Sequence, residues 1–207
     1  MKFAVRGTVC AVALVAALTG CGGDGDAADS AVGVVGIGSG DGKGKKSGPL
    51  SVEQVRAALP TNEELGAVWV GDDLAAFEGE MARRQCAKET GTSCDGLVAA
   101  GHKEAAVRGN SDDDDVEFTL FSFDSKQAAT AAMKGMAAKT GSGDPAPEPT
   151  QFTTGADETQ SFTNGRSSTR TVMRVGNVVA YVQASIYNTE NRNRMSTLQV
   201  ELIKKAG

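Results

Sequence analysis

Chemistry at an imidazole must use His102, because this 207-residue chain contains 1 histidine. A Ser-His-Asp hydrolase also needs a Gly-x-Ser-x-Gly elbow, and a penicillin-binding type of site needs Ser-x-x-Lys; the sequence has neither. Cys86 and Cys94 could join His102 at a metal, but their spacing matches none of the usual zinc patterns. We therefore predict a protein that is not an enzyme, with no metal and no cofactor.

A run of aspartates at residues 112–115 offers oxygen ligands for a cation. The run lacks the mid-loop glycine and the terminal bidentate glutamate of an EF-hand. Adjacent acids at the start of a strand are more typical of a solvated loop that protects a sheet edge. We predict such a loop here in preference to a calcium site.

Cys21 is the residue for which the sequence predicts a covalent modification. Lys2 and Arg6 precede an uncharged apolar run, residues 8–18, which is shorter than the roughly 17–25 residues of a membrane span. The run ends at Leu18-Thr19-Gly20-Cys21, which resembles the bacterial lipobox. The resemblance implies cleavage before Cys21 and attachment of a diacylglyceryl group to its thiol. The alternative is an ordinary secretory signal that leaves Cys21 free.

Cys86 and Cys94 form the second cysteine prediction. Cys10 lies in the predicted signal and Cys21 is assigned to lipid, which leaves this pair in an exported and oxidising setting. We predict a disulfide between them. Closing so short a loop would contribute about 2.6 kcal/mol on the chain-entropy model.

The elements that must position these residues fall into one folded domain. We predict a signal peptide at residues 1–20, a lipidated cysteine with a disordered Gly/Asp-rich linker at 21–48, and the domain at 49–207. The net charge of −5 argues against binding to nucleic acid. The predicted location is the extracytoplasmic side of the cell membrane, reached through lipid on Cys21.

Helical spacing and capping residues predict helices, and alternating apolar residues predict strands. The expected helices, some short, are residues 52–59, 61–66, 73–89, 126–139 and 189–205. The expected strands are residues 97–108, 116–123, 167–175 and 178–187, with residues 151–164 also extended. Gly176-Asn177 fits a two-residue hairpin turn between the last pair of strands.

This hairpin turn fixes the register, so that Val175 faces Val178 and Met173 faces Ala180 on the core side. The opposite side carries residues able to grip an anionic group or a partner peptide, and they form our candidate ligand face: Arg170, Arg174, Tyr181, Gln183 and Tyr187. The alternative is a solvated surface on which arginine stems pack against tyrosine rings.

The order of these features resembles that of a known family. A lipobox and linker precede helices, a cysteine pair, a Phe-rich strand and a helix with the run 128–132. Gly155-Ala156-Asp157-Glu158 and the hairpin Arg174-Val175-Gly176-Asn177-Val178-Val179 follow. Over roughly residues 50–205 the chain resembles actinobacterial surface lipoproteins related to the extracellular sensor domain of the PknH receptor kinase.

The resemblance implies an α+β fold, an antiparallel β-sheet with helices packed on one face, and a groove for an unidentified ligand. Sensor domains of that kind have two disulfides, whereas this chain has cysteines for one.

We hypothesise a lipid-anchored extracytoplasmic domain of the binding or sensor type, without catalysis. Its expected ligand is a small molecule or a component of the cell envelope, and the sequence points to no particular protein partner. The alternatives are a cell-wall hydrolytic enzyme with an unrecognised acidic site, and a structural or assembly lipoprotein. Convergent carboxylates in a pocket would favour the enzyme, a closed apolar groove would favour a ligand binder, and a flat surface with no pocket would favour the assembly role.

Overall fold

The computed structural model describes residues 48–71, 74–108, 114–165 and 168–207. The predicted signal peptide, Cys21 and the linker to residue 47 lie outside these residues, as do Asp112 and Asp113 of the aspartate run. The predicted division into signal, linker and domain therefore stays a prediction. None of the helices in the described part has the length and apolar character needed to cross a membrane.

The described residues form five helices and eight strands, in mixed order along the chain. The helices are α1 (Val52–Ala57), α2 (Asn62–Leu65), α3 (Gly79–Thr90), α4 (Lys126–Thr140) and α5 (Thr189–Ala206). The strands are β1 (Trp69–Gly71), β2 (Ala75–Glu78), β3 (Leu97–Val107), β4 (Asp115–Phe123), β5 (Glu148–Thr150), β6 (Glu158–Asn164), β7 (Ser168–Val175) and β8 (Val178–Ser185).

All eight strands belong to one antiparallel sheet. Their order is β1-β3-β4-β8-β7-β6-β5, and β2 also pairs with β3. The predicted hairpin is confirmed, because Val175 pairs with Val178 and Met173 with Ala180. Gly176 has a φ of +57° at the first central position of the turn, where a type II′ turn places glycine.

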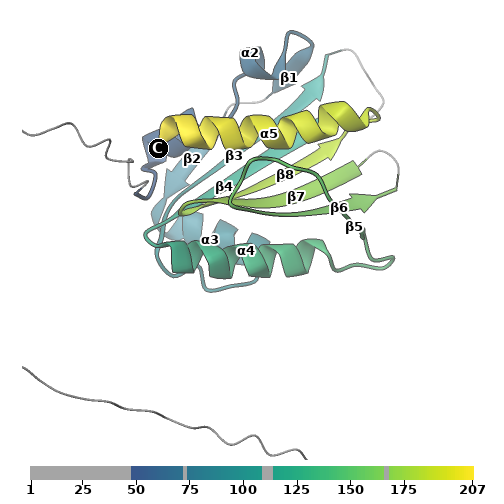
Figure 1. Cartoon of the computed structure of the whole chain (residues 1–207). Helices are drawn as coiled ribbons and strands as arrows, with labels where there is room; N and C mark the ends of the chain where they lie inside the picture. The colour runs from purple at the N-terminus through teal and green to yellow at the C-terminus, as the bar shows by residue number, and fades with distance from the viewer. Residues whose placement is uncertain (1–47, 72–73, 109–113, 166–167) are drawn as a thin grey trace, which may run out of the picture. The chain divides into compact units, whose positions relative to one another are not determined.

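Helices cover both faces of the sheet (Figure 1). On one face, α1 and α5 enclose a core that includes Val55, Phe118 and Met195. On the other, α3 and α4 enclose a second core that includes Phe121 and Met133. The sheet is therefore a middle layer between two layers of helix.

The predicted α+β class and antiparallel sheet are confirmed, but the expectation that helices pack on one face was wrong. The reason lies in β4, whose alternate residues are apolar on both sides. Phe118 and Leu120 face the first core, whereas Phe121 and Phe123 face the second, and all four are fully buried. A strand that is apolar on both faces needs a cover on each.

The start of α3 also differs from the sequence prediction. Residues 75–78, expected to be helical, form β2 against β3 instead. Gly79 has a φ of +71°, and the chain turns there from strand into helix. Both predicted capping boxes are present, with the side chains of Ser51 and Thr61 accepting from the third helical N–H of α1 and α2.

Candidate functional site

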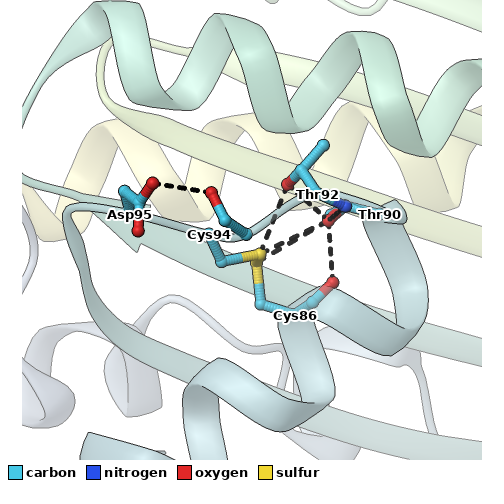
Figure 2. The surroundings of a disulfide bond; sticks show 6 residues. Cys86, Thr90, Thr92, Cys94 and Asp95 are labelled. Atoms are coloured by element: carbon cyan, nitrogen blue, oxygen red, sulfur yellow. Dashed lines mark hydrogen bonds between the residues drawn. A yellow bond between two sulfur atoms is a disulfide. The ribbon is translucent and has the colours of Figure 1, made fainter.

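Cys86 and Cys94 form the predicted disulfide (Figure 2). Cys86 lies in α3, and Cys94 lies in the segment that leads from α3 into β3. Both cysteines are buried, with 0 % and 3 % exposure, within the second core. The bond therefore ties the C-terminal half of α3 to the segment that leads into β3.

Two threonines surround the sulfur atoms of this disulfide. The hydroxyl of Thr90 donates to the carbonyl oxygen of Cys86 at 2.8 Å and lies 3.3 Å from Sγ of Cys94. The backbone N–H of Thr92 donates to the Thr90 hydroxyl at 3.2 Å. With both sulfurs buried and oxidised, this region is structural in character, and it offers no free thiol for chemistry.

The structure divides the candidate ligand face that the sequence predicted. It brings Arg170, Tyr181 and Gln183 into direct contact. It places Arg174 at the other end of β7, beside the hairpin turn. Tyr187 lies beyond the end of β8 and is 80 % exposed, and its backbone N–H donates to Asp114.

Arg174 is the most fully bonded of these residues. Its side chain is 3 % exposed and forms ion pairs with Glu158 at 2.6 Å and Asp157 at 3.1 Å. Its Nη1 also donates to the carbonyl oxygen of Gly176 at 2.9 Å. Because the guanidinium already holds two carboxylates and a carbonyl, its role is to join β6 to the hairpin turn.

The sheet face that carries Arg170, Tyr181 and Gln183 continues with polar residues on β4 and β3, on the same side of the sheet as α3 and α4. We call this surface the polar strip, and it consists of His102, Glu104, Glu117, Thr119, Arg170, Tyr181 and Gln183. Its residues pair directly across neighbouring strands: Arg170 with Gln183, Gln183 with Glu117, and Glu117 with Glu104. The next register row runs from Tyr181 through Thr119 to His102.

His102 links the two carboxylates of the polar strip. Its Nε2 lies 3.1 Å from Oε1 of Glu104, and its Nδ1 lies 3.7 Å from Oε1 of Glu117. Nδ1 also contacts the hydroxyl of Thr119 at 3.2 Å. Like charges directly opposite each other destabilise a sheet, and an imidazole between Glu104 and Glu117 reduces that repulsion when it carries a proton on each nitrogen.

The Thr119 hydroxyl has one proton to donate and lies beside two possible acceptors. Oε1 of Glu117 lies at 3.4 Å, and Nδ1 of His102 lies at 3.2 Å and donates or accepts according to its tautomer. Thr119 therefore connects His102 on β3 with Glu117 on β4.

Glu117 carries a perturbed carboxyl group. Burial raises the pKa of Glu117, the His102 side chain lowers it, and the nearby carboxylates of Glu104 and Glu89 raise it further. Glu89 reaches this environment from α3, so the helix contributes negative charge to the border of the polar strip. The ionised Glu117 is consequently short of compensating positive charge.

Tyr181 and Gln183 form the neutral centre of the polar strip. The Tyr181 hydroxyl donates to Oε1 of Gln183 at 2.9 Å, and Nε of Arg170 donates to the same oxygen at 3.1 Å. Burial raises the pKa of Tyr181 to about 12, against the lowering effect of Arg170. Tyr181 is therefore a neutral hydrogen-bonding group throughout the physiological range.

A hollow of about 400 Å³ opens beside the acidic end of the polar strip. It lies over the ends of β1, β3 and β4, and Glu104, Asp115 and Glu117 contribute its carboxylates. Its remaining lining is small and apolar, with Val70, Gly71, Ala105, Ala106 and Val116. The acidic end is thus recessed, whereas Arg170 lies three strands away from β3.

In the described residues, no group of three or more His, Cys, Asp or Glu side chains is placed to hold a metal ion. The polar strip offers groups for ionic recognition and hydrogen bonding, namely His102, the two glutamates, Arg170 and the neutral pair.

Sequence reasoning weighed His102 separately and did not identify Glu104, Glu117 or Thr119. The available signal was the i, i+2 spacing of His102 with Glu104 and of Glu117 with Thr119, which places each pair on one face of its strand. What was missing was the pairing of β3 with β4, which brings the two faces together.

These observations define an α+β domain with an open antiparallel sheet and helices on both faces. Its described part contains one disulfide, and the polar strip lies on the same sheet face as α3 and α4. A family model described as "Domain of unknown function (DUF7373) N-terminal" matches residues 55–206. The chain belongs to this family. A comparison with curated proteins finds no match.

Among solved structures, 3 chains match this fold. One is the crystal structure of the extracellular domain of PknH from Mycobacterium tuberculosis, with a TM-score of 0.54 and 15 % sequence identity. The similarity covers 76 % of this chain and 98 % of the PknH chain. The predicted resemblance to the PknH extracellular domain is therefore confirmed at the level of the fold.

Proposed function

We propose that this protein is a lipid-anchored extracytoplasmic binding domain of the sensor type, which recognises a ligand without chemically changing it. The observation that carries the proposal is the similarity of its fold to an extracellular domain, over 98 % of that domain's length. The lipobox supports the same location, because export precedes attachment of lipid to Cys21.

The anchor in this proposal is Cys21, and a diacylglyceryl group there supplies the membrane affinity. Each buried methylene contributes about 0.8 kcal/mol, so two acyl chains hold a protein where a single chain does not. The linker then separates the domain from the bilayer.

The anchor is tested with Cys21→Ala in the full chain, expressed in its host. We expect loss of lipid labelling and loss of the protein from the membrane fraction, because the alanine has no thiol. Cys10→Ala is the matched control and should leave both unchanged, since Cys10 lies within the cleaved signal. Continued lipid labelling of Cys21→Ala would contradict the anchor assignment.

The binding role is tested by native mass spectrometry of the full chain purified from its own membranes. We expect a bound molecule that is retained in the wild type and lost when Arg170 and Glu117 are both changed to Gln. A ligand held equally by the double variant would place the binding site elsewhere on the domain.

A second candidate, a cell-wall hydrolytic enzyme, is favoured by one observation. His102 lies between Glu104 and Glu117, and convergent carboxylates beside an imidazole can act as general acid and base. Incubation of the full chain with cell-wall material separates the candidates. Turnover that disappears in His102→Gln would establish the enzyme, whereas binding without turnover supports the domain proposed above.

A further inference from the structure

The charges of the polar strip are ordered along one register row. Arg170 on β7 pairs with Gln183 on β8, Gln183 pairs with Glu117 on β4, and Glu117 pairs with Glu104 on β3. A cation therefore stands at one end, a neutral amide stands next to it, and two carboxylates stand at the other end.

The cationic end has unused hydrogen-bonding capacity. Nε of Arg170 donates to Gln183, and within the described residues its Nη1 and Nη2 have no partner. Phe162 is the residue opposite Arg170 on β6, so no carboxylate neutralises it from that side. Two parallel N–H groups of a guanidinium match the two oxygens of a carboxylate.

The acidic end has unused accepting capacity. His102 contacts Oε1 of Glu104 and Oε1 of Glu117, whereas the Oε2 atoms have no hydrogen-bond partner in the described part of the chain. Glu89 from α3 adds further negative charge, and the hollow beside Glu104 and Glu117 leaves room for a compact cation. An ammonium group has three donors and suits such a set of oxygens.

The separation of the two ends sets the length of the ligand. Arg170 and Glu117 are separated by two strand spacings, or about 10 Å at about 4.8 Å each. An extended peptide spans at most about 3.3–3.6 Å per residue, so three residues reach about 10 Å. The Gln183 amide nitrogen lies between the ends and can donate to a peptide carbonyl oxygen.

We propose that the polar strip binds a short peptide with free termini, about three residues long, with its carboxylate on Arg170 and its ammonium beside the Oε2 atoms of Glu104 and Glu117. This assignment rests on the proposed binding function and adds the chemical class of the ligand. A simple anion would be repelled by the glutamates, and a simple cation would leave Arg170 unused. The interior of a long polypeptide has neither terminal charge.

The test uses the full chain in detergent and titrates it calorimetrically near neutral pH with tri-alanine. Three blocked forms are compared: N-acetyl tri-alanine, tri-alanine amide and the doubly blocked peptide. We expect either single block to weaken binding by at least about tenfold, as the loss of one charge-assisted contact predicts. Di-alanine should bind more weakly because it is too short to reach both ends.

Variants assign each peptide terminus to its end of the polar strip. Arg170→Gln should bind tri-alanine and tri-alanine amide equally, while it still prefers the free ammonium. Glu117→Gln should lose most of the preference for the free ammonium and keep the preference for the carboxylate. Arg84→Gln, an exposed arginine on α3, is the matched control and should bind as the wild type does.

The proposal is overturned if tri-alanine shows no binding at millimolar concentration, or if blocking either terminus has no effect. Binding of a different ligand class to the same chain would overturn the peptide assignment and leave the binding function intact. Release of free alanine during the titration would contradict the proposed function itself, because the domain would then be catalytic.

Discussion

The two arginines of β7 face the same side of the sheet, four residues apart, yet their surroundings are opposite. Arg174 is 3 % exposed and bonded to Glu158, Asp157 and the Gly176 carbonyl. Arg170 is half-buried and bonded to one amide oxygen, that of Gln183. One arginine stabilises the fold, and the other is available to a ligand.

The difference comes from the neighbouring strand β6. In the register of β6 with β7, Glu158 lies opposite Arg174, whereas Phe162 lies opposite Arg170. The aromatic ring packs near the end of α4, where a side chain at Gly141 would meet it. An arginine on β7 therefore stabilises the fold where β6 places a carboxylate opposite it, and remains available to a ligand where β6 places an aromatic ring opposite it.

Replacing Arg174, the arginine that is bonded to two carboxylates, should give the largest loss of stability. Arg174→Gln leaves Asp157 and Glu158 without their cation and cannot reproduce the forked contact. We expect a loss of about 3 kcal/mol, at the low end for a buried pair because both carboxylates are partly exposed. Thermal unfolding should show a fall in Tm of about 6–12 °C.

A Tm within error of the wild type would show that the two arginines of β7 are equivalent after all. Arg174→Lys should recover part of the loss, since an ammonium can pair with one carboxylate but not hold both carboxylates and the carbonyl.

Opening the disulfide should affect the covered part of the sheet face and spare the polar strip. Cys86→Ser removes a constraint worth about 2.6 kcal/mol on the chain-entropy model. Because α3 packs on β3 and β2, we expect faster amide hydrogen exchange in α3, while the β3–β4 amides change only in proportion to the global stability.

The Cys94→Ser variant is the natural control, because it breaks the same bond from the other side. Equal losses in both variants would assign the effect to the bond, whereas unequal losses would assign part of it to the local packing of each sulfur.

The sequence predicted the β7–β8 hairpin because two residues of turn chemistry, Gly176 and Asn177, determine its register locally. The disulfide followed from the cysteine count. The polar strip could not be predicted in the same way, because Glu104 meets Glu117 only through the pairing of β3 with β4. The sequence between Val107 and Asp115 is longer than a two-residue turn of the kind that fixes the register of β7 with β8.

The prediction that the helices pack on one face of the sheet was wrong for a related reason. The apolar stripe of α4, with Ala129, Met133 and Met136, shows that the helix packs on a sheet but does not say on which face. The double-sided apolar pattern of β4 at Phe121 and Phe123 was the available signal for a second covered face. The burial of the neighbouring Val172 and Val179 in the same core shows that this face is covered across β4, β8 and β7.

Arg170, the arginine that is available to a ligand, should contribute little to the stability of the fold. Arg170→Gln removes one hydrogen bond to Gln183 and no ion pair in the described residues, so we expect a loss of about 0.5 kcal/mol. Urea unfolding of Arg170→Gln and Arg174→Gln under the same conditions measures the contrast directly. A loss for Arg170→Gln as large as that for Arg174→Gln would contradict an available role.

The smallest expected effect is a gain in stability, in the variant Glu117→Gln. Burial raises the pKa of Glu117 above its ordinary value of 4.5, helped by Glu104 and Glu89 and opposed by His102. As pH rises from the ordinary value through the raised one, the native state keeps this proton longer than the unfolded state, so the free energy of unfolding falls. Glu117→Gln cannot ionise, and its amide oxygen can still accept from Thr119.

We therefore expect Glu117→Gln to be more stable than the wild type by about 0.3 kcal/mol at about pH 7, and nearly equal to it at about pH 4, where most of the wild-type carboxyl is protonated in both states. Urea unfolding at the two pH values measures the difference, with Glu80→Gln on the exposed side of α3 as the control. A loss of stability at neutral pH would mean that the ionised Glu117 is already compensated, as Glu158 is by Arg174. The polar strip would then be a second saturated network, with no free charge for an ammonium group.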